Sequence, residues 1–175
     1  MTVSSGQTYL AIPGPSVIPE EVLRSMHRAA PNIYEGDLIE TTESLIPDLN
    51  YVAQSSGNVA IYIANGHGIW EAALSNIATA NDHILVVATG RFAHGWAEMA
   101  RKLGIKVDVV DFGKNRALDI EVLAKKLKSE SKTKYKAILM THVDTSTSVK
   151  NDILNVRKKL DEINCSALLA VDCIA

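Results

Sequence analysis

Residues 83–88 read His-Ile-Leu-Val-Val-Ala, and this run ends at Thr89-Gly90. The run is continuously apolar after its first residue, which is typical of a strand buried on both faces of a parallel sheet. A glycine directly after it marks the place where the strand ends. Similar short runs recur along the chain, together with one segment in which apolar and polar residues alternate. The sequence therefore predicts five strands, at residues 59–64, 83–88, 105–109, 137–141 and 167–171.

Amphipathic segments separate most of the predicted strands. In the segment that begins at Asp119, apolar residues recur three and four positions apart, which predicts a helix with one buried face. Strands that alternate with such helices are joined by right-handed crossovers into a parallel sheet. The predicted fold class is therefore α/β, with a mostly parallel sheet and helices on both faces. Helices are expected at 69–78 and 93–103, from Asp119, from Asn151 or Asp152, and earlier from Pro19 and at 41–53.

Length and composition exclude several classes of protein. The 175 residues are 47% hydrophobic and 22% charged, as in ordinary globular chains. The net charge of −2 gives no electrostatic reason to expect nucleic acid as a partner. No apolar run approaches the roughly 20 residues needed to span a bilayer, and residues 1–10 lack the layout of a secretory signal. Two cysteines cannot build a disulfide framework, so a cytoplasmic location is expected.

Polar residues follow the predicted strands at the edge where open parallel sheets bind ligands. The first of these groups is Asn65-Gly66-His67-Gly68, a turn with two glycines before a predicted helix. Such a turn lets the backbone approach a ligand closely and offers free N–H groups to a phosphate. An ordinary turn that uses glycine only for its dihedral angles explains the pattern equally well. The remaining groups are Thr89-Gly90-Arg91-Phe92, residues 142–147 and Asp172.

Asp172 is the strongest single signal, because a carboxylate at the end of a buried strand is costly without a partner. A protonated heterocycle or a metal ion would serve as that partner. A metal ion is disfavoured because no cluster of His, Cys and Asp residues has the spacing of metal ligands. A Ser-His-Asp hydrolase is also disfavoured, because the sequence contains no G-x-S-x-G motif. Phe92 is interpreted either as a core residue or as a ring that faces a ligand. The hydroxyls of residues 145–147 either bind a ligand or satisfy their own loop.

Taken together and in this order, these residues resemble the class V, fold-type I aminotransferases that use pyridoxal phosphate. The similarity is greatest to the serine/alanine/aspartate–glyoxylate branch. It extends from Pro13-Gly14-Pro15 through residues 66–74 and 145–147 to Val171-Asp172. The resemblance implies a transaminase that moves an amino group from serine, alanine or aspartate to glyoxylate or a related 2-oxo acid. It also implies small amino-acid and 2-oxo-acid substrates and a homodimer.

The resemblance also implies a role for individual residues. Asn65-Gly66-His67 match the segment that holds the cofactor phosphate, and Phe92 matches the aromatic that stacks on the pyridine ring. Thr145 matches the hydroxyl that bonds the phenolic oxygen of the ring. Asp172 matches the aspartate that pairs with the pyridine nitrogen and keeps it protonated.

Two further matches concern the substrate. Gly14 resembles the N-terminal stretch that lies over the substrate. The His/Tyr-Arg-Ser-Pro segment of the family reads Tyr34-Glu35-Gly36-Asp37 here, with an acidic residue in place of the arginine. Tyr34 is thus the matching substrate-site residue, and the change at residue 35 leaves the amino donor undetermined within the branch.

The predicted domain organisation follows from the same resemblance. Residues 1–58 are expected to form an N-terminal segment with helices, and residues 59–175 the first part of the cofactor-binding large domain. The chain stops three residues after Asp172, which directly follows the last predicted strand, so we expect an N-terminal fragment. The Schiff-base lysine of the family would then lie beyond Ala175, and the chain by itself would be inactive. A non-catalytic module that binds the cofactor or a phosphate, or serves in assembly, is the alternative function.

Overall fold

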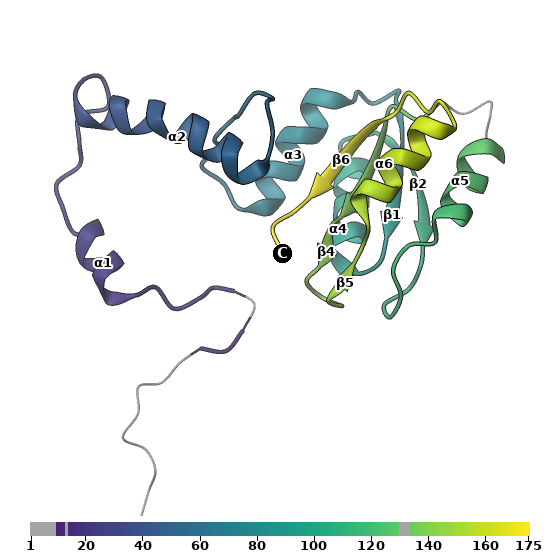
Figure 1. Cartoon of the computed structure of the whole chain (residues 1–175), viewed down its shortest axis with the longest axis horizontal. Coiled ribbons are helices and arrows are strands. Elements are labelled where there is room, and N and C mark those ends of the chain that lie inside the picture. The colour runs from purple at the N-terminus through teal and green to yellow at the C-terminus, as the bar shows by residue number, and fades with distance from the viewer. Residues whose placement is uncertain (1–9, 13, 130–133) are drawn as a thin grey trace, which may run out of the picture. The chain divides into compact units, whose positions relative to one another are not determined.

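The computed structural model describes residues 10–12, 14–129 and 134–175, which divide into two compact units, residues 1–61 and 62–175. The first unit contains helices α1 (Glu20–Met26) and α2 (Asp37–Ala53), shown in Figure 1. Both helices confirm a predicted segment, although α2 begins four residues before the expected Thr41. Its N-cap is Gly36 with φ +82°, a conformation that glycine adopts without strain.

The second unit is built on four parallel strands in the order β2-β1-β3-β6. In the register of this sheet, Val86 of β1 lies between Val109 of β2 and Leu139 of β3. This arrangement confirms the predicted α/β fold with a mostly parallel sheet. The strands are β1 (His83–Ala88), β2 (Lys106–Asp111), β3 (Ala137–Thr141) and β6 (Leu168–Asp172).

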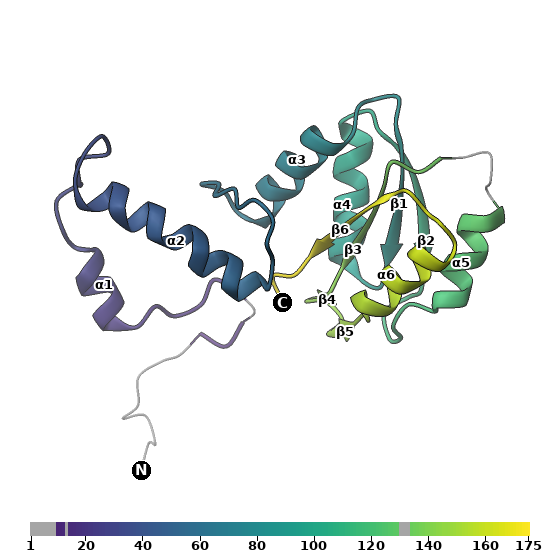
Figure 2. The same ribbon diagram turned by 45° about the horizontal axis from the view of Figure 1, so that its top comes forward.

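Helices cover both faces of the sheet, as Figures 1 and 2 show. On one face, Ile84 and Val86 pack in a cluster with residues of α3 and α4. On the other face, Leu85 and Val87 pack with residues of α5 and α6. Successive residues of β1 therefore serve opposite cores, which explains why the strand has no polar face. The helices are α3 (Gly66–Ile77), α4 (Arg91–Lys102), α5 (Ile120–Ser129) and α6 (Ile153–Glu162).

The strand predicted at residues 59–64 is wrong. This segment is irregular, and Ala60 to Ala64 are exposed, with Ile63 fully so. No described strand pairs with it. A β-branched apolar run has the side chains of a strand, but it forms one only where a neighbouring strand accepts its hydrogen bonds.

A short hairpin follows β3 that the sequence did not predict. It consists of β4 (Val143–Asp144) and β5 (Val149–Lys150), which pair antiparallel. Strands of two residues are too short to produce a periodic pattern. The hairpin carries Thr145 in its turn, at the C-terminal edge of the large sheet.

Among the described residues, no helix combines the length and the apolar character that crossing a bilayer requires.

Candidate cofactor site

The turn that opens α3 leaves two N–H groups of the helix N-terminus without an acceptor among the described residues. Asn65 caps the helix, because its Oδ1 accepts a hydrogen bond of 3.1 Å from the Gly68 N–H. The N–H groups of Gly66 and His67 find no acceptor in the described part of the chain. Such N–H groups, together with the positive end of the helix dipole, favour an anion. Asn65, Gly66 and His67 thus lie together, and their predicted contact with a phosphate stays a prediction.

The two glycines of this turn have different surroundings. A Cβ on Gly68 would lie 2.7 Å from the Cβ of Ala64, whereas a Cβ on Gly66 would meet nothing within 4 Å. Gly68 is therefore needed for packing. Gly66 leaves open space directly beside the unpaired N–H groups.

The contrast between the two glycines predicts different effects of alanine. We expect Gly68→Ala to lower the free energy of unfolding by about 1–3 kcal/mol, because the new methyl overlaps Ala64. Gly66→Ala is expected to change it by less than about 1 kcal/mol, because its methyl meets open space. Urea unfolding of the two variants measures the difference. Equal destabilisation by both would contradict this account of the turn.

Trp70 connects the other predicted site residues. It is buried in α3, and its Nε1 donates a 3.0 Å hydrogen bond to Oδ2 of Asp172 at the end of β6. Its ring centroid lies 4.6 Å from that of His67 and 6.2 Å from that of Phe92. Sequence reasoning gave Trp70 no role, although the residue stands in the segment that carries the resemblance. Asp172, Phe92 and His67 therefore all lie around the buried indole of Trp70.

The second carboxylate oxygen of Asp172 is also held. Oδ1 accepts a hydrogen bond of 3.1 Å from the Ile174 N–H.

Burial raises the pKa of the adjacent Cys173 thiol, and the charge of Asp172 raises that pKa further. The thiol therefore stays protonated at neutral pH and is a poor nucleophile. Of the two neighbouring residues at the end of β6, Asp172 is therefore the candidate for contact with a ligand.

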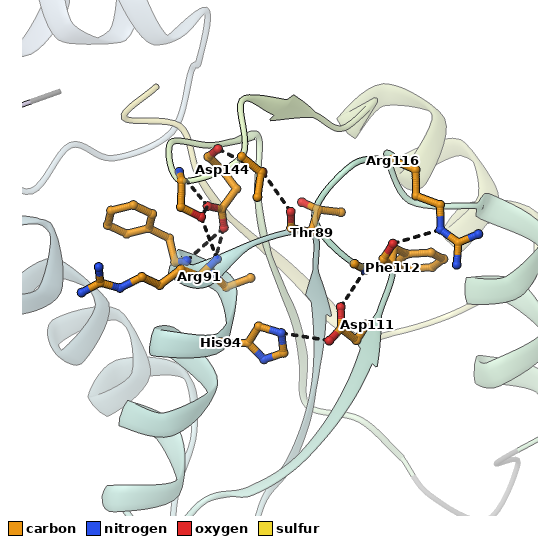
Figure 3. Close-up of polar contacts among 12 residues, drawn as sticks. Thr89, Arg91, His94, Asp111, Phe112, Arg116 and Asp144 are labelled. Atoms are coloured by element: carbon orange, nitrogen blue, oxygen red, sulfur yellow. Dashed lines mark hydrogen bonds and ion pairs between the residues drawn. The ribbon is translucent and has the colours of Figure 1, made fainter. Parts of the chain in front are cut away.

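Asp144 forms a buried network that sequence reasoning missed (Figure 3). Its Oδ2 accepts from the N–H groups of Phe92 (3.0 Å) and Ala93 (3.3 Å) in the first turn of α4. Its Oδ1 accepts from the N–H (3.1 Å) and the hydroxyl (2.6 Å) of Ser146. The Ser146 Oγ accepts in turn from the Arg91 N–H at 2.9 Å. One carboxylate therefore joins the start of α4 to the hairpin.

Two more side chains of the hairpin region bond to the end of β1. The Thr147 hydroxyl donates to the Thr89 carbonyl at 3.0 Å. The buried Asn151 donates to Thr89 Oγ1 at 2.9 Å and to the Thr141 carbonyl at 3.0 Å, and its Oδ1 accepts from the Leu118 N–H. Thr145 itself is half-buried, and its hydroxyl has no hydrogen-bond partner within the described ranges. Its predicted contact with the phenolic oxygen of the cofactor stays a prediction.

The remaining predicted site residues, Gly14 and Tyr34, belong to the first unit. Tyr34 is 84% exposed, and its N–H donates to the Asn32 side chain. Their part in substrate binding stays a prediction. Throughout the described part of the chain, no group of three or more His, Cys, Asp and Glu side chains is arranged to hold a metal ion.

These residues fit pyridoxal phosphate. Free N–H groups of Gly66 and His67 suit its phosphate, the half-buried Phe92 offers an aromatic face, and Asp172 offers a fixed carboxylate. A pocket of about 420 Å³ lies against His67, Trp70 and Phe92 and continues along α4 as far as Lys102. Asp172 and Thr145 do not line this pocket, so its volume says nothing of the space between them.

Comparison with known proteins gives one matching family model and several relatives. The model of aminotransferase class-V matches residues 8–175. The serine–glyoxylate aminotransferase of Arabidopsis thaliana is 34% identical over 95% of this chain and 42% of the relative. The L-aspartate–glyoxylate aminotransferase of Paracoccus denitrificans is 30% identical over 96% of this chain and 43% of the relative. The chain thus spans well under half the length of these relatives.

Solved structures share the fold. The alanine–glyoxylate aminotransferase of Nostoc sp. superposes with a TM-score of 0.81 at 22% identity, covering 91% of this chain and 41% of that one. The ureidoglycine–glyoxylate aminotransferase of Bacillus subtilis gives a TM-score of 0.80 at 24% identity, covering 91% and 40%. At these identities the likeness concerns the fold.

Proposed function

The chain belongs to the aminotransferase class-V family, and from that premise we propose that its second unit holds pyridoxal phosphate at the edge of the sheet. The proposed reaction of the whole protein is transfer of an amino group from serine, alanine or aspartate to glyoxylate or a related 2-oxo acid. The observation that carries the proposal is the Trp70–Asp172 hydrogen bond. It ties a carboxylate to the indole of Trp70, whose ring centroid lies 6.2 Å from that of Phe92 and whose helix has two unpaired N–H groups at its start.

Each residue has a separate task in this proposal. Gly66 and His67 donate their N–H groups to the phosphate, and Phe92 covers one face of the pyridine ring. Thr145 donates its hydroxyl to the phenolic oxygen. Asp172 accepts a hydrogen bond from the ring nitrogen and keeps the proton there, because a carboxylate favours the charged form of a neighbouring base. When bound, the cofactor supplies an electron sink for the amino acid.

Trp70 prepares Asp172 for this task. A carboxylate with one oxygen on the indole and the other on the Ile174 N–H cannot rotate freely. Its remaining lone pairs then face a fixed direction before the cofactor binds, which lowers the ordering cost of binding.

Partners and location complete the proposal. Small amino acids and 2-oxo acids are the proposed substrates, a homodimer the proposed assembly and the cytoplasm the proposed location. Gly14 and Tyr34 are the proposed substrate-site residues from the first unit. A non-catalytic module that binds the same cofactor is the second candidate.

Fluorescence titration of the purified chain with pyridoxal phosphate tests the proposed site. We expect saturable quenching of tryptophan emission, because Trp70 lies against Phe92 and Asp172. Inorganic phosphate is expected to compete, since both ligands need the N–H groups of Gly66 and His67. The absence of saturable binding would contradict the proposal. No glyoxylate-dependent turnover is expected from this chain by itself, so measurable turnover by the same preparation would contradict the expectation that the chain lacks the Schiff-base lysine.

A further inference from the structure

We propose that Asp144 is a positioning residue of this site, which sets the place of the Phe92 ring relative to Thr145. The inference rests on the function proposed above. Asp144 touches none of the residues that would bind the phosphate. It acts instead through the backbone of the first turn of α4.

The burial of Asp144 is unusual for an acidic side chain. In the chain as described, it is the one Asp or Glu that is fully buried. A buried carboxylate is costly unless hydrogen bonds replace its water. Asp144 receives such bonds from three N–H groups and one hydroxyl, and the first turn of α4 adds the positive end of its helix dipole.

The donors to Asp144 come from the two segments that carry predicted cofactor contacts. Phe92 donates its own N–H, so the carboxylate fixes the backbone that bears the stacking ring. Ser146 donates from the residue next to Thr145. The two segments lie more than 50 residues apart in the sequence. A single side chain therefore sets the spacing between the ring and the hydroxyl.

Gly90 shows how closely these segments approach. A Cβ on Gly90 would overlap the carboxylate group of Asp144. The φ of Gly90 is 175°, an extended backbone that other residues adopt as well, so only this approach requires glycine. The backbone before α4 therefore lies in close contact with the Asp144 carboxylate. Figure 3 shows the carboxylate above this turn, with its hydrogen bonds drawn.

Asp144→Asn tests the proposal, because it keeps the size of the side chain and removes its charge. One end of the amide is a donor and would face the N–H groups of either Phe92 or Ser146. We expect the first turn of α4 to shift and the affinity for pyridoxal phosphate to fall about tenfold, comparable to losing one aromatic stacking contact. The affinity for inorganic phosphate should stay the same, because the Gly66 turn is unchanged.

Asp152→Asn is the matched control. Asp152 also caps a helix, since its Oδ1 accepts from the Asn155 N–H at the start of α6. It has no bond to α4, so this variant should bind pyridoxal phosphate as the unchanged chain does. Circular dichroism of the bound cofactor is the second readout. At saturating pyridoxal phosphate, Asp144→Asn should reduce this signal, whereas a purely structural role would leave the signal of the folded, saturated protein unchanged.

If Asp144→Asn does not fold, Ser146→Ala replaces it. That variant removes the hydroxyl that bridges Asp144 and the Arg91 N–H, and it should weaken pyridoxal phosphate binding in the same direction. Unchanged affinity and dichroism in the folded variant would overturn the positioning role alone. Failure of the unchanged chain to bind pyridoxal phosphate would overturn the proposed function and, with it, this inference.

Discussion

Gly90→Ala is expected to lower the free energy of unfolding by about 3 kcal/mol, since its methyl group would collide with a buried, fully hydrogen-bonded carboxylate. Relief would require Asp144 to leave the first turn of α4, which would uncover the N–H groups of Phe92 and Ala93. A loss of this size is a large share of the roughly 5–15 kcal/mol that stabilises a typical domain. Urea unfolding followed by circular dichroism gives the measurement.

Gly95→Ala is the control for this prediction. Gly95 lies inside α4, and its added Cβ would meet Trp70 at 3.5 Å, an ordinary van der Waals distance. Alanine is favoured over glycine within a helix by up to about 1 kcal/mol, so this variant should be as stable as the unchanged chain or more stable. If Gly90→Ala is as stable as Gly95→Ala, the close approach of Gly90 to Asp144 does not make glycine necessary at position 90.

Asp172→Asn is expected to weaken pyridoxal phosphate binding by about 10- to 100-fold, because one charge-assisted hydrogen bond to the ring nitrogen is lost. The amide oxygen of the variant still accepts from the Trp70 indole, whereas the amide NH2 cannot accept from the Ile174 N–H. Because that N–H is exposed, water can replace the lost acceptor, so the fold around β6 should persist. Inorganic phosphate should bind the variant as it binds the unchanged chain. Isothermal titration calorimetry with both ligands measures these affinities.

An analogue of the cofactor with carbon in place of the ring nitrogen provides the matching control. The unchanged chain should bind this analogue about as weakly as the Asp172→Asn variant binds pyridoxal phosphate. Combining the variant and the analogue should bring little further loss, because both remove the same hydrogen bond. Independent, additive losses would indicate that Asp172 and the ring nitrogen do not meet.

Strands were predicted correctly where the local run of apolar residues was enough to define them. Residues 83–88 and 137–141 form β1 and β3 at the predicted bounds, because each is a continuous apolar run with a clear end. Residues 59–64 are also a continuous apolar run and yet form no strand, because an apolar run does not supply a neighbouring strand. The hydrophobic pattern of a segment carries no information about which distant segment it pairs with.

The same limit applies to the site. Asp172 stood out because it directly follows an apolar run, although in the structure it ends β6, an edge strand whose residues are at most partly buried. Asp144 carries a comparable signal three residues after β3, but its role depends on α4, 52 residues earlier in the chain. Trp70 likewise meets Asp172 across 102 residues. Local sequence identified the carboxylate that would meet the cofactor, and the folded structure was needed to find the residues that hold it and the ring in place.

A crystal structure of the chain grown with pyridoxal phosphate is the most direct test of the proposed site. We predict the phosphate over the N–H groups of Gly66 and His67, the pyridine ring against Phe92, and the ring nitrogen within hydrogen-bond distance of Asp172. A cofactor bound elsewhere, with the Gly66 turn empty and Asp172 facing only Trp70 and Ile174, would contradict the account.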